Sequence, residues 1–288
     1  MQLILLTKYF STLSLNDLIE TIKSVGCRGA DYCVRPGLPV EPENCDKKLP
    51  KIVKQFNDEG LTVPMVTAPA NFSDPTVAYA EKLFAGCALA RVKIIKPGYW
   101  FMGEDGYYST VESVRKIIDK FAKLAEKYNV KVGIHNHSQA VLPHVSMTPN
   151  SSTAMNLVNG FDPRYVGIYS DPGHLSMRGE SLTMAIDMVK DYLCAVALKD
   201  VVWERFIKED KSRTWQRRFV GLGEGYVDWK LLVGQLKKIK FDGPISIHSE
   251  YDGYDIGKLF DQTRMDVRFF KQIMQEQDYN KKSCSNIS

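Results

Sequence analysis

The chain has 288 residues, of which 44% are hydrophobic, 11% aromatic and 25% charged, a composition that is typical of a globular protein and excludes a largely disordered one. Its 38 basic and 34 acidic side chains leave a formal charge of +4, too small and too evenly spread for a nucleic-acid surface. No apolar run reaches the ~20 residues that cross a bilayer, and the six cysteines are dispersed without CxxC spacing. We therefore expect a cytoplasmic protein with a small-molecule partner, no nucleic acid and no membrane association.

Short apolar runs alternate with amphipathic stretches along almost the whole chain. The runs that predict buried parallel strands cover 3–7, 29–34, 62–67, 92–96, 131–135, 166–170, 194–199 and 244–248. The stretches that predict helices cover 14–25, 43–58, 74–89, 109–128, 150–159, 180–190, 228–239 and 258–276. Eight such repeats predict a single-domain (β/α)8 TIM barrel at 1–277, followed by a disordered polar tail at 278–288. An open doubly wound sheet is the alternative, but no GxGxxG motif follows the first run.

Some shorter segments also carry local signals. Ser14 and Asp17 resemble a capping box, and Asp74 followed by Pro75 predicts the start of a helix. The segment 204–218 has six basic and three acidic residues and is interpreted as a solvated loop, with a phosphate clamp as the alternative. The glycine-rich stretch 221–225 follows no nucleotide-binding pattern and is interpreted as a tight turn on the substrate side.

Polar side chains gather at the carboxyl ends of the predicted strands, where barrels of this type carry their active sites. They are Lys8, Asp31, Arg35, Thr67, Lys96, His135, His137, Asp171, His174, Lys199, Asp200, His248 and Glu250. All five histidines, with His144 as the fifth, lie in or just after the fifth, sixth and eighth strands. Strand alternation places His135, Asp171 and Glu250 near one level. One imidazole and two carboxylates suit a single divalent ion, Mn²⁺, Co²⁺, Zn²⁺ or Mg²⁺.

Several motifs at these strand ends resemble the xylose-isomerase-like TIM barrel superfamily of sugar-phosphate isomerases and epimerases, over about residues 3–276. The motifs are Ile134-His135-Asn136-His137, Asp171-Pro172-Gly173-His174, Leu198-Lys199-Asp200, Leu222-Gly223-Glu224-Gly225 and Ile247-His248-Ser249-Glu250-Tyr251. The resemblance implies a metal held by Glu, Asp, His and Glu on strands five to eight, which correspond here to His135, Asp171, Ala197 and Glu250. Alanine cannot ligate a metal, and the strand-five carboxylate is lost. The resemblance therefore implies an altered metal site.

The resemblance and the strand-end residues together predict an isomerase or epimerase that acts on a sugar, a keto-sugar or a sugar phosphate. Metal-assisted proton transfer next to a carbonyl is the expected chemistry, with Glu250 as base and His137, His174 and Lys199 as acid or base partners. The residues expected to bind substrate are Arg35, Lys96, Trp100, Trp203 and His248. A related lyase or dehydratase reaction is the alternative. A homo-oligomer is also expected, because barrels of this family commonly associate.

Two other hypotheses stay open. Lys199 or Lys96 would form a Schiff base with a keto-sugar without any metal, since desolvation makes an amine nucleophilic. Alternatively, the chain is a non-catalytic sugar-binding barrel with a degenerate metal site. In that case the stacking surfaces would come from Tyr99, Trp100, Trp203 and Trp215.

Overall fold

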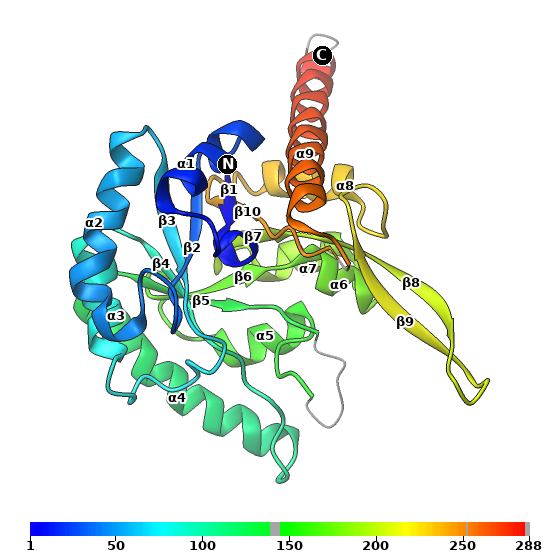
Figure 1. Ribbon diagram of the computed structural model, residues 1–288. Coiled ribbons are helices and arrows are strands. Elements are labelled where there is room, and N and C mark those ends of the chain that lie inside the picture. The colour runs from blue at the N-terminus through cyan, green and yellow to red at the C-terminus, as the bar shows by residue number, and fades with distance from the viewer. Residues whose placement is uncertain (139–144, 252, 286–288) are drawn as a thin grey trace.

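Eight parallel strands close into a barrel in the computed structural model, which describes residues 1–138, 145–251 and 253–285 (Figure 1). The barrel strands are β1 (Gln2–Leu6), β2 (Gly29–Cys33), β3 (Thr62–Thr67), β4 (Ile94–Lys96), β5 (Lys131–His135), β6 (Val166–Ser170), β7 (Leu193–Leu198) and β10 (Pro244–Ile247). Their order around the barrel is β1-β10-β7-β6-β5-β4-β3-β2, and the pairing of β1 with β10 closes it. Each predicted strand overlaps one of these, so the predicted (β/α)8 barrel is confirmed.

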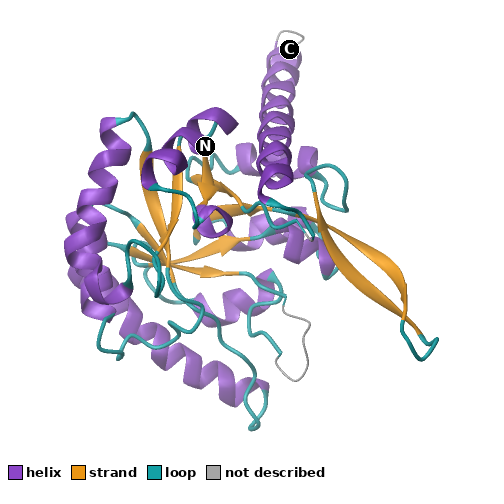
Figure 2. Cartoon of the chain, viewed as in Figure 1, coloured by secondary structure: helices purple, strands orange, loops and turns teal. Residues whose placement is uncertain are grey.

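Helices surround this barrel, as Figure 2 shows. They are α1 (Leu15–Val25), α2 (Cys45–Asp58), α3 (Ala80–Leu89), α4 (Tyr107–Tyr128), α5 (Ser151–Val158), α6 (Pro172–Met177), α7 (Leu182–Val189), α8 (Trp229–Lys238) and α9 (Ile256–Ser285), with the 3-10 turns η1 (Thr7–Phe10) and η2 (Pro42–Asn44). Apolar side chains between helices and strands form the main core. A smaller buried cluster on five of the strands includes Ile4, Met65, Tyr169 and Ala197. Packed strands of this kind leave the strand ends free to carry a site.

Of the two helix starts that the sequence predicts, the one at Ser14 is confirmed and the one at Asp74 is wrong. Ser14 caps α1 as predicted, because its hydroxyl accepts a hydrogen bond from the backbone N–H of Asp17 at 3.2 Å. The predicted start at Asp74 is wrong, since α3 begins at Ala80. The Asp74 carboxylate instead accepts a bond from the backbone N–H of Thr76, only two residues on, which forms a local turn and competes with a helix.

The segment 204–218 is not the solvated loop that its charge predicts. It lies within an antiparallel hairpin of β8 (Asp200–Ile207) and β9 (Arg213–Val220), which projects from the barrel in Figure 1. The strands are paired from Asp200 opposite Val220 out to Ile207 opposite Arg213. β-Branched and aromatic residues favour this pairing, although charged side chains cover much of its surface.

The last helix, α9, continues to Ser285 and so enters the segment 278–288, for which the sequence predicts disorder. Residues 286–288 lie outside the described residues, as does His144. Among the residues that are described, no helix combines the length and the apolar character that a bilayer crossing needs. The domain bounds, the cytoplasmic location and the homo-oligomer stay predictions.

Candidate active site

A cavity of about 160 Å³ opens at the carboxyl ends of the barrel strands. It is lined by Arg35, Lys96, His135, His137, Lys199, His248 and Glu250, which the sequence predicts as site residues, together with Lys8, Thr67, Tyr99 and Tyr169. Its volume is below the ~300–1,000 Å³ of pockets that take drug-sized ligands. The cavity therefore suits a small polar molecule, the size class of a monosaccharide.

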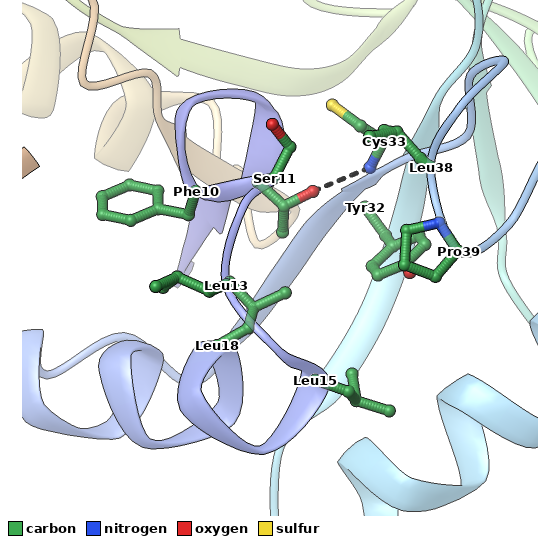
Figure 3. A pocket seen from close by; sticks show the side chains of 10 residues that line it. Phe10, Ser11, Leu13, Leu15, Leu18, Tyr32, Cys33, Leu38 and Pro39 are labelled. Carbon is green, nitrogen blue, oxygen red and sulfur yellow. Dashed lines mark hydrogen bonds between the residues drawn. The ribbon is translucent and has the colours of Figure 1, made fainter.

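A second hollow lies between η1, α1 and β2 (Figure 3). Its walls are mostly apolar, with Phe10, Leu13 and Leu18 on one side, and its volume is only about 30 Å³. Thr7 and Cys33 also line it, and the hydroxyl of Thr7 accepts a hydrogen bond from the backbone N–H of Cys33 at 2.9 Å. A space of this size holds about one water molecule, so it is no substrate site.

Glu250 is held in the cavity wall by its two neighbours in the chain. Ser249 adopts a left-handed conformation with φ of 50°, and its hydroxyl is 2.8 Å from that of Thr263 in α9. Tyr251 donates a hydrogen bond to Asp266 at 2.6 Å. Burial alone would raise the pKa of Glu250, but opposing effects, led by the charge of Lys199 and including its hydrogen bond and the charge of Lys8, together lower it further. The net pKa is well below the ordinary value, so Glu250 is an ionised carboxylate at neutral pH.

The ammonium of Lys199 lies at the centre of the buried charges. Its Nζ is 2.8 Å from Oε2 of Glu250, 3.2 Å from Oδ2 of Asp171 and 3.0 Å from Nε2 of His174. Burial lowers the pKa of Lys199, and the two carboxylates raise it by more, so the net shift is upward. Burial raises the pKa of Asp171 to about 6, against the opposing charge of Lys199. Lys199 is therefore a permanent cation at neutral pH and not a free amine.

The histidines of the site are neutral at pH 7. Burial lowers the pKa of His135, His174 and His248 well below the ordinary value and that of His137 to about 3, with the positive charge of Lys199 adding to each shift. His174 accepts from Lys199 at Nε2, so its Nδ1 carries the proton and donates to the hydroxyl of Ser138 at 2.8 Å. The sequence predicts His137 and His174 as acid or base partners, and burial, by lowering the pKa of each, disfavours their protonated forms at neutral pH.

Tyr169 was missed as a site residue, although it has the same strand parity as Asp171. Its hydroxyl donates to Oδ2 of Asp31 at 3.1 Å and lies 2.7 Å from Nε2 of His248. Burial raises the pKa of Asp31 to about 6, while hydrogen bonds from Thr67, Ser246 and Tyr169 oppose the shift. This network fixes the His248 ring beside the cavity. Residues two apart on a strand share a face, and that rule was sufficient to find Tyr169.

Lys96, at the end of β4, has a different environment from Lys199. Its Nζ lies 3.7 Å from the centre of the Tyr99 ring, and within the described part of the chain no carboxylate pairs with it. Burial lowers its pKa to about 7, the charge of Arg35 adds to that shift, and Asp31 opposes it. Lys96 therefore has a pKa near neutrality, whereas the pKa of Lys199 in the same cavity wall is raised.

The two predicted tryptophans do not line the cavity. Trp100 is buried, donates from its ring N–H to the backbone oxygen of Ser73 at 2.9 Å, and packs edge-on against Phe121. Trp203 lies on β8, opposite Arg217 of β9. Asp171 and His174 are fully buried and do not line the cavity, but both contact Lys199, which does.

A family model, described as Xylose isomerase-like TIM barrel, matches residues 19–273 of this chain. The chain belongs to this family. The match covers every barrel strand except β1, together with the strand ends that carry the cavity. The sequence-based assignment to the xylose-isomerase-like superfamily is confirmed.

Proteins similar to this chain include a dehydratase by sequence and epimerases by fold. An inosose dehydratase of Lactiplantibacillus plantarum is 26% identical over 174 residues, which cover 57% of this chain and 55% of that protein. This chain thus matches about half the length of that curated relative. D-psicose 3-epimerase of Clostridium cellulolyticum H10, solved with D-tagatose, is 15% identical with a TM-score of 0.68 over 95% of this chain and 99% of that one. A 3-keto-D-glucoside 4-epimerase of E. coli is 14% identical with a TM-score of 0.69 over 93% and 99%. The likeness to the two solved structures is one of fold.

Three residues of the site offer donor atoms for the divalent ion that the family resemblance implies. His135, Asp171 and His174 each offer one donor atom, and these atoms lie within 4.8 Å of one another. The ammonium of Lys199 already contacts two of these donors, and it also contacts Glu250, the other predicted ligand. An ion and an ammonium would compete for the same lone pairs and repel each other. In this arrangement the residues present fit an ammonium and do not fit a divalent ion.

Proposed function

We propose that this protein transfers a proton next to the carbonyl group of a keto-sugar or a related cyclic keto-polyol, as an isomerase or epimerase. One observation carries the proposal. A small cavity is lined both by an ionised carboxylate, Glu250, and by an amine, Lys96, whose pKa is about 7. Membership of a family whose relatives are named as sugar epimerases and an inosose dehydratase supports the same class of chemistry.

The roles of Glu250 and Lys96 follow from their charges at neutral pH. Glu250 takes the proton from the carbon beside the carbonyl group, because its carboxylate is ionised and lines the cavity. A weakly basic carboxylate can do this only if the developing enolate is stabilised. The protonated form of Lys96 donates a hydrogen bond to that oxygen, in a site screened from bulk water. His137 is neutral, and its Nδ1 has no hydrogen-bond partner among the described residues, so it is free to bind a substrate hydroxyl.

The test is solvent exchange. Purified protein is incubated in D₂O with a panel of keto-sugars, their phosphates and inososes, and loss of the C–H signal beside the carbonyl is followed by ¹H NMR. We expect exchange at one carbon of at least one compound, together with the new stereoisomer or isomer. Binding of a sugar without exchange across the panel would contradict the proposal and favour a non-catalytic sugar-binding barrel.

Dehydration is a second candidate, and one observation favours it. The family resemblance implies a carboxylate at the end of strand five, and this chain has the neutral His135 there. Without a second carboxylate to return the proton on the opposite face, removal of the proton can be followed by loss of a β-hydroxyl, for which Lys96 would act as the acid. Mass spectrometry of the same reactions run in H₂O distinguishes the two, because dehydration removes one water and epimerisation conserves mass.

Of the two lysines in the Schiff-base hypothesis, only Lys96 remains a candidate. Lys199 holds its proton between two carboxylates, so it is no nucleophile. Lys96 is the remaining amine, and borohydride reduction in the presence of substrate would link the two covalently if an imine forms.

The pH dependence of kcat/KM is expected to follow Lys96. Because its folded-state pKa is lowered to about 7, Lys96 is charged below that pH and neutral above it. Because the pKa of Glu250 is lowered, its carboxylate is already ionised in mildly acidic solution, and activity is expected to be high there. Above about pH 7, where Lys96 loses its proton, activity is expected to fall roughly tenfold per pH unit. Lys96→Arg, which stays charged, should remove this fall. Lys93→Arg, at an exposed lysine of the same segment, is the matched control and should keep it. A wild-type profile that rises through pH 7 would contradict the assigned role.

A further inference from the structure

Lys199 makes an unusually complete set of contacts for a lysine beside an active site. An ammonium has three N–H donors, and three acceptors surround this one: Asp171 at 3.2 Å, Glu250 at 2.8 Å and His174 at 3.0 Å. The side chain is 3% exposed and Asp171 is fully buried. Glu250 and His174 accept hydrogen bonds from this ammonium. Oδ2 of Asp171 has no hydrogen-bond partner among the described residues and is held by the ion pair with Lys199. The contacts of Lys199 are those of a bound cation.

The acceptors around Lys199 also have the spacing of metal donors. Oδ2 of Asp171 lies 3.5 Å from Nε2 of His135 and 3.8 Å from Nε2 of His174. Donors that each lie about 2.0–2.1 Å from a tetrahedral ion are roughly 3.3 Å from one another. Two imidazoles and two carboxylates would complete such a site if Glu250 joined them. Three of the four donors are therefore already grouped, Glu250 would have to join them, and the ammonium of Lys199 contacts Asp171, His174 and Glu250.

Among the lysines and carboxylates that form ion pairs around Asp171 and Glu250, the formal charges balance without an ion. Asp171 and Glu250 supply two negative charges when ionised, and Lys199 and Lys8, the latter 3.3 Å from Oε1 of Glu250, supply two positive ones. Ala197 lies two residues before Lys199 and has the same strand parity, at the position where the family resemblance implies a histidine ligand. Ala197 is packed in the small apolar cluster with Ile4 and Tyr169 and offers no donor. A divalent ion bound here would therefore lack the ligand expected at position 197, and Lys199 and Lys8 already neutralise the two carboxylates.

We propose that Lys199 takes the place of the divalent cation in this chain, and that its removal opens a four-ligand site for Zn²⁺, Co²⁺ or Mn²⁺ made by His135, Asp171, His174 and Glu250. This inference goes beyond the proposed function, because it concerns cation binding in the absence of any substrate. It gives Lys199 a positioning role: the ammonium holds Glu250 and orients His174.

Metal binding by untagged protein tests the proposal directly. Wild-type protein purified without chelator should contain less than about a tenth of an equivalent of transition metal by mass spectrometry, and calorimetric titration with Zn²⁺, Co²⁺ or Mn²⁺ should show no site. Lys199→Ala should bind about one equivalent. Its Co²⁺ form should show the visible absorption of a low-coordinate nitrogen and oxygen site. One tightly bound ion per wild-type chain would overturn the proposal.

Two variants control for indirect effects. Lys96→Ala removes another buried lysine of the same cavity, one that makes no ion pair or hydrogen bond with the four ligands among the described residues, and it should gain no metal site. Adding Asp171→Asn to Lys199→Ala should weaken binding by at least about 10–100-fold, since it removes a charged ligand. If Lys199→Ala is unstable without metal, its melting temperature should rise on addition of Zn²⁺ while that of wild type does not. A folded Lys199→Ala protein that binds no metal would also refute the proposal, whatever the protein's activity.

Discussion

Replacement of Glu250 with Gln is expected to slow deuterium exchange into the substrate by about 10²–10⁴-fold, the range that a positioned general base contributes. Gln has nearly the same shape as Glu, and its single amide oxygen can still accept the hydrogen bond from Lys199 at 2.8 Å, although its NH2 group cannot replace the oxygen that Lys8 contacts at 3.3 Å. The amide cannot take a proton at neutral pH. The loss should therefore fall on kcat with little change in KM, as measured by ¹H NMR in D₂O and by steady-state kinetics.

The control for this change is Glu112→Gln, which alters the same residue type at an exposed position on α4 and should leave exchange unchanged. Circular dichroism and thermal melting of Glu250→Gln establish that the variant is folded. Exchange at the wild-type rate in a folded Glu250→Gln protein would exclude Glu250 as the base, and the search would turn to Lys96.

The barrel itself could be predicted because its main signal is local. A strand buried on both faces has a short run of apolar residues, and each of the eight runs overlaps a barrel strand. The hairpin of β8 and β9 could not be predicted from the same signal. Its pairing joins residues as far apart as Asp200 and Val220, and its exposed faces carry the charges that suggested a loop. The start of α3 was predicted wrongly because a local turn at Asp74 competes with the helix.

The positions of the site residues could be predicted better than their chemistry. Strand ends and strand parity brought His135, Lys199 and Glu250 to one cavity. Their protonation depends on burial and on contacts between strands far apart in sequence, which no motif contains. Lys199 is the clearest case: it was predicted as an acid or base partner, and the structure encloses its ammonium between Asp171 and Glu250.

Asp200 shows how a strand-end carboxylate can serve the fold. It follows Lys199 directly, but it is fully buried and points to the loop on the other side of the strand end. Its Oδ1 accepts from the backbone N–H groups of Val201 and Val227, at 2.9 and 3.2 Å. Its Oδ2 accepts from Gly223 and Gly225, at 3.0 and 3.2 Å, and from the ring N–H of Trp229 at 2.9 Å. The glycine-rich stretch 221–225, interpreted from the sequence as a turn on the substrate side, thus wraps around this carboxylate.

Asp200→Ala is therefore expected to destabilise the fold by more than about 3 kcal/mol. The change leaves five N–H donors without their acceptor in a buried site, and each buried donor that stays unpaired costs roughly 1–3 kcal/mol, less where water enters. The free energy of unfolding would be measured by urea denaturation, followed by circular dichroism.

Asp210→Ala supplies the matched control for Asp200→Ala, since Asp210 is exposed near the hairpin turn and accepts from the backbone N–H of Ser212 alone among the described residues. Its effect should stay within about 0.5 kcal/mol. Gly225→Ala should reproduce part of the Asp200→Ala effect from the other side, because a Cβ at position 225 would lie 2.1 Å from Oδ1 of Asp200. If Asp200→Ala and Asp210→Ala both lower the free energy of unfolding by a similar small amount, the turn at 221–225 forms without the Asp200 carboxylate and the prediction is wrong.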